Sequence, residues 1–159
     1  MKIILMVAAS IHRLWLLMLL FACSVSGANM PNASKSEYFK TDGAMFVLNR
    51  EQMAFRYWLL LSVSKPLPDH AIVEVAFENP TNKISPLMLI REVSAADKEL
   101  KLESTAIFGL KYRKNYEVEV RLFADAEKTK IISTHRQQIQ YAMPPKELKR
   151  VTEAWKEKR

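Results

Sequence analysis

The stretch that decides the fold runs from Asn115 to Ala124 and reads NYEVEVRLFA. Its apolar side chains lie at every second position and alternate with charged ones, as Tyr116, Val118, Val120 and Leu122 against Glu117, Glu119 and Arg121. Successive side chains of a strand point to opposite faces. This period of two therefore predicts an antiparallel strand with one buried face and one solvent face.

The same alternation extends outward from this stretch along most of the chain. Clusters rich in Pro, Asn, Asp and Lys interrupt it, as at 65–69, 79–82 and 125–128. The apolar run Leu87–Ile90 predicts a strand that is bent or buried on both faces. Seven strands are expected, near 44–49, 53–64, 71–78, 86–93, 99–108, 115–124 and 130–141. This pattern predicts an all-β fold, a seven-stranded antiparallel sandwich, with a small barrel as the alternative.

Gly109-Leu110 followed by Tyr116–Val120 resembles the corner between the fifth and sixth strands of fibronectin type III domains, which are immunoglobulin-like sandwiches. The resemblance implies that the hydroxyl of Tyr116 binds the backbone of the corner. This chain has Tyr112-Arg113 where the family usually has Pro-Gly. Alternation also points Trp58 away from the buried face of its strand, whereas the family's early tryptophan is a core residue.

Residues 1–28 have the organisation of an export signal. Lys2, His12 and Arg13 precede the uncharged apolar run Leu14–Ala22, and small residues follow it. That run is too short to span a bilayer. The signal therefore predicts an exported protein.

The only cysteine of the chain, Cys23, ends the apolar run. Leu20-Phe21-Ala22-Cys23 resembles the lipobox of bacterial lipoproteins, in which the cysteine is acylated and becomes the N-terminus. The resemblance implies a lipid anchor at Cys23, and Ser24 after it implies transfer to the outer membrane. Cleavage after Ala28 is the alternative, and it implies a periplasmic or secreted protein.

Two segments flank the predicted sandwich of residues 44–143. Residues 29–43 are polar and are predicted to form a flexible tether. Residues 144–159 carry Leu148, Val151 and Trp155 at helical spacing among Lys and Glu, which predicts a basic amphipathic helix. Whether this helix docks on the sandwich or stays free is open at this point.

No residue pattern predicts catalysis, a metal site or a cofactor. His70 and His135 are expected on the surface, far from a third metal ligand. Glu74, Glu117 and Glu119 lie on the solvent side of their strands, and cross-strand ion pairs with Arg121 and Arg136 are expected there.

One end of the sandwich is expected to be basic. The formal net charge is +7, and removal of Lys2 and Arg13 with the signal leaves +5. With alternating strand directions, the first, third and fifth connections and the helix share the end opposite the tether. These segments carry Arg50, Lys83, Lys111, Arg113, Lys114, Lys149 and Arg150.

An apolar patch is expected on the outer face of one sheet, near the tethered end. Alternation points Ile72, Phe123 and Ile132 outward, and the fibronectin-like order places their strands side by side. Three large apolar side chains on a charged face suggest a partner surface. The alternative is that a loop covers them or that a β-bulge turns Phe123 inward.

Together these features favour a non-catalytic, envelope-anchored protein-interaction module, such as an accessory subunit of a secretion, surface or cell-wall assembly. Its partner would be an envelope protein. The alternative is a binding module for an anionic polymer or lipid headgroups, and an exported hydrolase is less favoured. Strands without exposed interleaved aromatics, together with the export signal, argue against nucleic acid.

Overall fold

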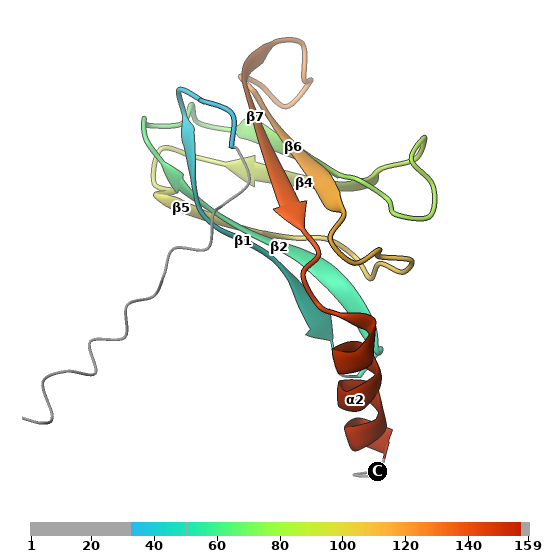
Figure 1. The fold of residues 1–159 in the computed structure, drawn as a ribbon. Coiled ribbons are helices and arrows are strands. Elements are labelled where there is room, and N and C mark those ends of the chain that lie inside the picture. The colour runs from blue at the N-terminus through green and yellow to red at the C-terminus, as the bar shows by residue number, and fades with distance from the viewer. Residues whose placement is uncertain (1–32, 50, 157–159) are drawn as a thin grey trace, which may run out of the picture.

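Two antiparallel sheets face each other across one hydrophobic core in the computed structural model, which describes residues 33–49 and 51–156 (Figure 1). One sheet has three strands in the order β1-β2-β5, and the other has four in the order β4-β3-β6-β7. The strands are β1 Phe39–Asn49, β2 Ala54–Val63, β3 Ala71–Phe77, β4 Leu87–Val93, β5 Glu99–Glu103, β6 Asn115–Phe123 and β7 Ile131–Gln140. The predicted seven-stranded β-sandwich is confirmed.

The core is built by the inward rows of alternating strands. Tyr57, Leu59 and Leu61 of β2 and Val118, Val120 and Leu122 of β6 are almost fully buried. The edge strand β4 behaves differently from the prediction. Met88 and Ile90 are exposed on its outer side, so burial on both faces, one of the two predicted alternatives, is wrong.

Strand β1 begins five residues before the predicted start of the sandwich at 44. Phe39 is buried and pairs with Val63, so residues 39–43 belong to a strand and not to the predicted tether. The register shifts between Thr41 and Gly43. A β-bulge of this kind breaks the period of two, and the sequence therefore reads as a turn where the strand continues.

Residues 33–38 lead into β1 along the edge strand β7. The backbone N–H of Ser34 donates to the carbonyl oxygen of Arg136 at 2.8 Å, and the Arg136 N–H donates to the Ser34 hydroxyl at 2.8 Å. The part of the predicted tether that precedes residue 33, and the export signal with Cys23, lie outside the described residues.

Strand β5 ends at Glu103, before the predicted 108. The hydroxyl of Ser104 accepts the Tyr57 N–H at 3.0 Å and donates to the Thr105 carbonyl at 2.7 Å. The Ser104 hydroxyl thus takes the place of a backbone carbonyl in the hydrogen bonding between β2 and β5. Beyond it, the two segments pair only through an isolated β-bridge between Phe55 and Ile107. The chain then turns through the corner that leads to β6.

The corner carries the hydrogen bond that the fibronectin-like motif implies. The backbone N–H of Lys111 donates to the Tyr116 hydroxyl at 2.7 Å, and Leu110 packs against the core. Arg113 has φ +62°, in the left-handed region that favours glycine. Arg113 thus adopts a backbone conformation that glycine adopts more readily.

Helix α2, Pro145–Lys156, begins at the paired prolines and lies at the end of the sandwich where β1 ends and β2 begins (Figure 1). A proline at the first helical position loses no intrahelical hydrogen bond. Leu148 packs against the core, whereas Val151 and Trp155 remain partly exposed. The helix therefore docks through its first turns.

Candidate binding surfaces

The outer face of the four-stranded sheet brings together two of the three predicted patch residues. Ile72 of β3 pairs with Phe123 of β6, but the residue opposite Phe123 on β7 is Ile131. A register shift after Leu122 moves the alternation of β7 by one residue. Ile132 consequently packs against the core, so its predicted place on the outer face is wrong.

Phe123 is covered rather than presented to solvent. Only 6% of its surface is exposed, and the Lys128 Nζ lies 5.8 Å from the centroid of its ring. The same ammonium group binds the Glu74 carboxylate at 2.6 Å, which fixes the β6–β7 turn over the ring. Of the three predicted patch residues, only the partly buried Ile72 therefore remains on this face, together with the exposed Ile131, which was not predicted there.

Cross-strand ion pairs occupy the rest of this face, as predicted. Glu74 is nearly buried and binds the Arg121 guanidinium at 3.2 Å in addition to Lys128. The Glu119 carboxylate lies 2.8 Å from the Arg121 guanidinium and 2.7 Å from the Arg136 guanidinium. Arg136 also lies 3.8 Å from the Glu117 carboxylate. Alternating charges on three neighbouring strands thus form a continuous network.

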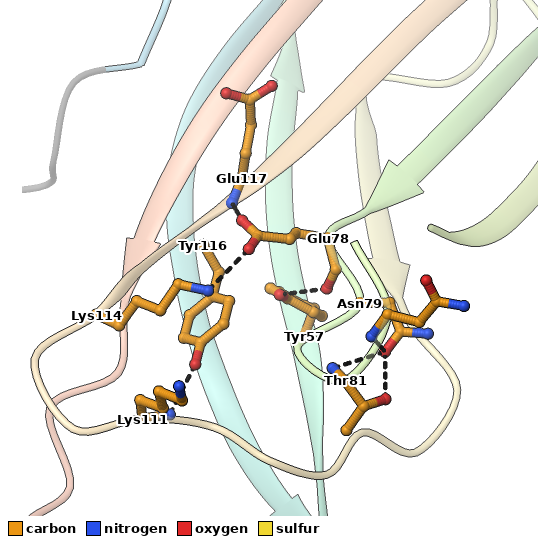
Figure 2. Close-up of polar contacts among 9 residues, drawn as sticks. Tyr57, Glu78, Asn79, Thr81, Lys111, Lys114, Tyr116 and Glu117 are labelled. Carbon is orange, nitrogen blue, oxygen red and sulfur yellow. Dashed lines mark hydrogen bonds and ion pairs between the residues drawn. The ribbon is translucent and has the colours of Figure 1, made fainter. Parts of the chain in front are cut away.

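At the predicted basic end, Glu78 engages Lys114 (Figure 2). One carboxylate oxygen of Glu78 lies 3.0 Å from the Lys114 Nζ, and the other accepts the Glu117 N–H at 3.1 Å. The carbonyl oxygen of Glu78 also accepts the Tyr57 hydroxyl at 2.7 Å. The Lys114 Nζ lies 4.2 Å from the centroid of the Tyr116 ring. Lys114 therefore ties the β3–β4 connection to the corner.

The other predicted cations of this end also lie among acids or aromatic rings. Lys83 shares a polar groove of about 400 Å³ with Glu78, Glu117 and Glu119. The Arg113 guanidinium lies 5.1 Å from the centroid of the Tyr112 ring. Lys111 lies in the same corner and binds Tyr116 through its backbone, whereas Arg50 lies outside the described residues.

On helix α2 both predicted cations have carboxylate neighbours. Arg150 lies 2.7 Å from Glu147, and Lys149 lies 3.8 Å from Glu153. Both cationic side chains are mostly exposed, so these pairs are screened and weak. The described predicted cations lie in the β3–β4 connection, in the corner before β6 and on helix α2, and acids lie among them.

His135 is buried, which contradicts its predicted surface location. His135, Gln137 and Ile139 pair with the inward-facing Val120, Val118 and Tyr116 of β6, so the regular alternation of β7 turns them inward. The His135 Nε2 lies 2.8 Å from the Thr41 hydroxyl. Burial lowers the pKa of His135 below its ordinary value. His70 is exposed, as predicted, and its hydrogen bond to Glu92 raises its pKa.

A different apolar surface lies on the outer face of the three-stranded sheet. Met45 and Val47 of β1 are 49% and 44% exposed, and Met45 pairs with the partly exposed Trp58 of β2. Leu60, two residues further on, pairs with Gly43, which leaves room for the Trp58 ring. Met45, Val47, Trp58 and Leu60 are called the β1–β2 face below.

The border of the β1–β2 face carries both charges. Arg56 pairs with Val47, while Glu103 and Lys101 of β5 pair with Trp58 and Leu60. An apolar centre with a polar rim is typical of protein–protein interfaces. Trp58 was predicted to point away from the core, but Met45, Val47 and Leu60 were not predicted beside it, although the alternation along β1 and β2 also points them outward.

The described part of the chain contains no helix with the length and apolar content that a bilayer-spanning segment requires. Nor do its His, Cys, Asp and Glu side chains form a group of three that could hold a metal ion. No protein-family model, curated protein or solved structure matches the chain.

Proposed function

We propose that the protein is a non-catalytic interaction module of the cell envelope, which docks a second protein on its β1–β2 face. The observation that carries the proposal is the exposure of Met45 and Val47 beside Trp58 on a sheet whose opposite face forms the core. Contiguous exposed apolar groups with a polar rim mark partner sites more often than isolated ones do.

The charges around this face favour a protein partner. Arg56 and Lys101 alternate with Glu99 and Glu103 along its border. A polymer of uniform negative charge would meet the two carboxylates as well as the cations. A protein surface with an apolar centre and charges of both signs complements this border better.

The basic end gives less support to binding of an anionic polymer. Lys114 is engaged by Glu78, and Lys83 shares its groove with three carboxylates. Such interleaved charges produce a weaker local field than a continuous cluster of cations would. The protein-docking function is therefore preferred.

The first test changes the exposed part of the β1–β2 face. Met45→Ser and Val47→Ser together should weaken partner capture from solubilised envelopes at least tenfold, because burial of one such side chain contributes about 1.5–3 kcal/mol. The thermal midpoint should change little, since both side chains are already half exposed and strand propensities span about 1 kcal/mol. Quantitative mass spectrometry of the captured proteins measures the effect.

A matched control comes from the other sheet. Met88→Ser and Ile90→Ser also replace exposed apolar side chains of a strand, and they should leave capture intact. Equal capture by the wild type and both double variants would contradict docking on the β1–β2 face.

The envelope location rests on Cys23, which we propose is acylated after signal cleavage. The support is the sequence Leu20-Phe21-Ala22-Cys23 at the end of an apolar run. Stable anchoring requires more than one acyl chain, which a modified lipoprotein N-terminus supplies. Cys23→Ser should leave the precursor uncleaved or release the protein from membranes. Intact-mass measurement of the wild type tests this directly, and an unmodified N-terminus at Asn29 would refute the lipid anchor.

A further inference from the structure

Two grooves flank helix α2 where it meets the end of the sandwich. One, of about 430 Å³, lies between the helix and the corner that contains Phe108 and Leu110. The other, of about 500 Å³, lies between the helix and β1. Phe55 and Tyr141 line both grooves. The apolar surface formed by Phe55 and Tyr141 therefore extends beyond both sides of the helix.

The first groove has the size and lining of a ligand site. Pockets for small molecules typically measure roughly 300–1,000 Å³ and are mostly apolar with a few polar groups. Apart from Lys149 and Thr152, the groove is lined by apolar residues and Gly109. Phe108, which is 62% exposed, and Met53, which is 36% exposed, both line this groove. An extended apolar ligand would bury both side chains.

Tyr141, which lines both grooves, has a buried hydroxyl that lacks a hydrogen-bond partner among the described residues. Its side chain is 4% exposed. Its ring is fixed edge-on between Phe46 and Phe55, with centroids at 5.7 Å and 5.1 Å. A buried hydroxyl without a partner is unfavourable, and an acceptor atom of a ligand would satisfy it.

A cation stands at the mouth of the first groove. Lys149 lines this groove, and its side chain is mostly exposed. Its nearest acid, Glu153, lies 3.8 Å away, which leaves the ammonium group able to receive an anion from solvent. The site thus combines an apolar trough, a buried donor and a basic rim.

We infer that the groove beside helix α2 binds a single-chain anionic lipid with an ester linkage. Its acyl chain would lie against Phe55, Phe108 and Leu110, its ester carbonyl would accept the Tyr141 hydroxyl, and its anionic head would meet Lys149. The Tyr141 hydroxyl is buried, so the carbonyl reaches it only if helix α2 shifts. The first turns of α2, which pack against the core through Leu148, are the part of the helix that would have to move.

The experiment titrates the purified protein calorimetrically with palmitoyl-lysophosphatidylglycerol below its micelle concentration. Saturable binding of one lipid per chain is expected. The ether-linked analogue, which has no carbonyl, should bind about tenfold more weakly. Tyr141→Phe should bind the ester and the ether lipid equally, and its thermal midpoint without lipid should be unchanged or higher, because the unpartnered hydroxyl is gone.

Two further variants test the trough and the rim. Phe108→Ser should weaken binding about tenfold, and Lys149→Gln should remove the preference for lysophosphatidylglycerol over lysophosphatidylcholine. The matched controls are Ile84→Ser and Lys101→Gln, which change an exposed apolar and an exposed basic residue elsewhere and should not alter binding.

Three outcomes would overturn the inference. They are the absence of saturable binding, equal affinity of the wild type and Phe108→Ser, and adsorption to phosphatidylglycerol vesicles without binding of the monomeric lipid. The last outcome would identify attraction by net charge alone. Equal ester and ether affinities in the wild type would overturn the role of Tyr141.

Discussion

The hydroxyl of Tyr116 holds the corner between β5 and β6 through the Lys111 N–H. Tyr116→Phe removes the acceptor and leaves a part-buried donor unsatisfied, which costs about 1–3 kcal/mol. We expect the thermal midpoint to fall by roughly 2–8 °C for each kcal/mol lost, the range that covers domains of about 60–250 residues. The control is Tyr112→Phe, because Tyr112 is exposed in the same corner. A midpoint for Tyr116→Phe equal to that of the control would show that the bond adds nothing to stability.

His135 makes the stability of the domain depend on pH. Its side chain is 1% exposed, and burial lowers its pKa in the folded state. Below the ordinary histidine pKa of about 6.5, the unfolded chain binds a proton that the folded chain does not. The free energy of unfolding should therefore fall as the pH drops from 6.5 through the lowered pKa of His135.

Urea unfolding between pH 8 and pH 5 measures this dependence. The histidine contribution is the difference between the wild type and His135→Gln, because carboxylates affect both proteins alike. The wild type should lose more stability toward pH 5 than the variant does. If the free energy of unfolding of the two proteins changed with pH in parallel, the pKa of His135 would be the same in the folded and unfolded states, which would contradict the prediction.

At the scale of the element, Gly43 links the bulge in β1 to the β1–β2 face. A Cβ at this position would lie 2.8 Å from the Trp58 ring, so Gly43→Ala must displace the indole outward. In a background that lacks Trp15 and Trp155, the emission of Trp58 should shift to the red. Lys40→Ala in the same strand is the control, and an unchanged spectrum for Gly43→Ala would contradict the close packing of Trp58 against Gly43.

The sequence predicts the regular strands well because one side of each sheet is buried. In β6, the alternation of Tyr116, Val118, Val120 and Leu122 with charged residues places the strand within one residue of its observed end. Alternation does not predict the β-bulges, however. A single extra residue near Ile132 or Gly43 reverses which side chains face inward, and no local signal distinguishes a bulge from a turn.

The candidate sites depend even more on tertiary structure. The charge network of Glu74, Arg121 and Glu119 follows from strand order and is predictable. The burial of Phe123 depends on Lys128, which reaches it from a turn. The grooves at helix α2 combine residues from β1, β2, the 107–110 corner and the helix, so periodicity within one element cannot reveal them.

For the whole molecule, the two sheets present contrasting outer faces. On the four-stranded sheet, ion pairs cover the face between Glu74 and Arg136. On the three-stranded sheet, Met45, Val47 and Trp58 remain accessible. In the proposed function, the three-stranded sheet would dock the partner, whereas the ion pairs of the four-stranded sheet stabilise the fold.

The most direct test of the account is site-specific photo-crosslinking in intact cells. A photoreactive amino acid at Val47 probes the β1–β2 face, and the same group at Met88 probes the exposed edge of the other sheet. We predict one abundant protein adduct from position 47, lost when Met45 is changed to Ser, and no such adduct from position 88. Absence of a protein adduct at position 47, or the same adducts from both positions, would contradict docking through the β1–β2 face.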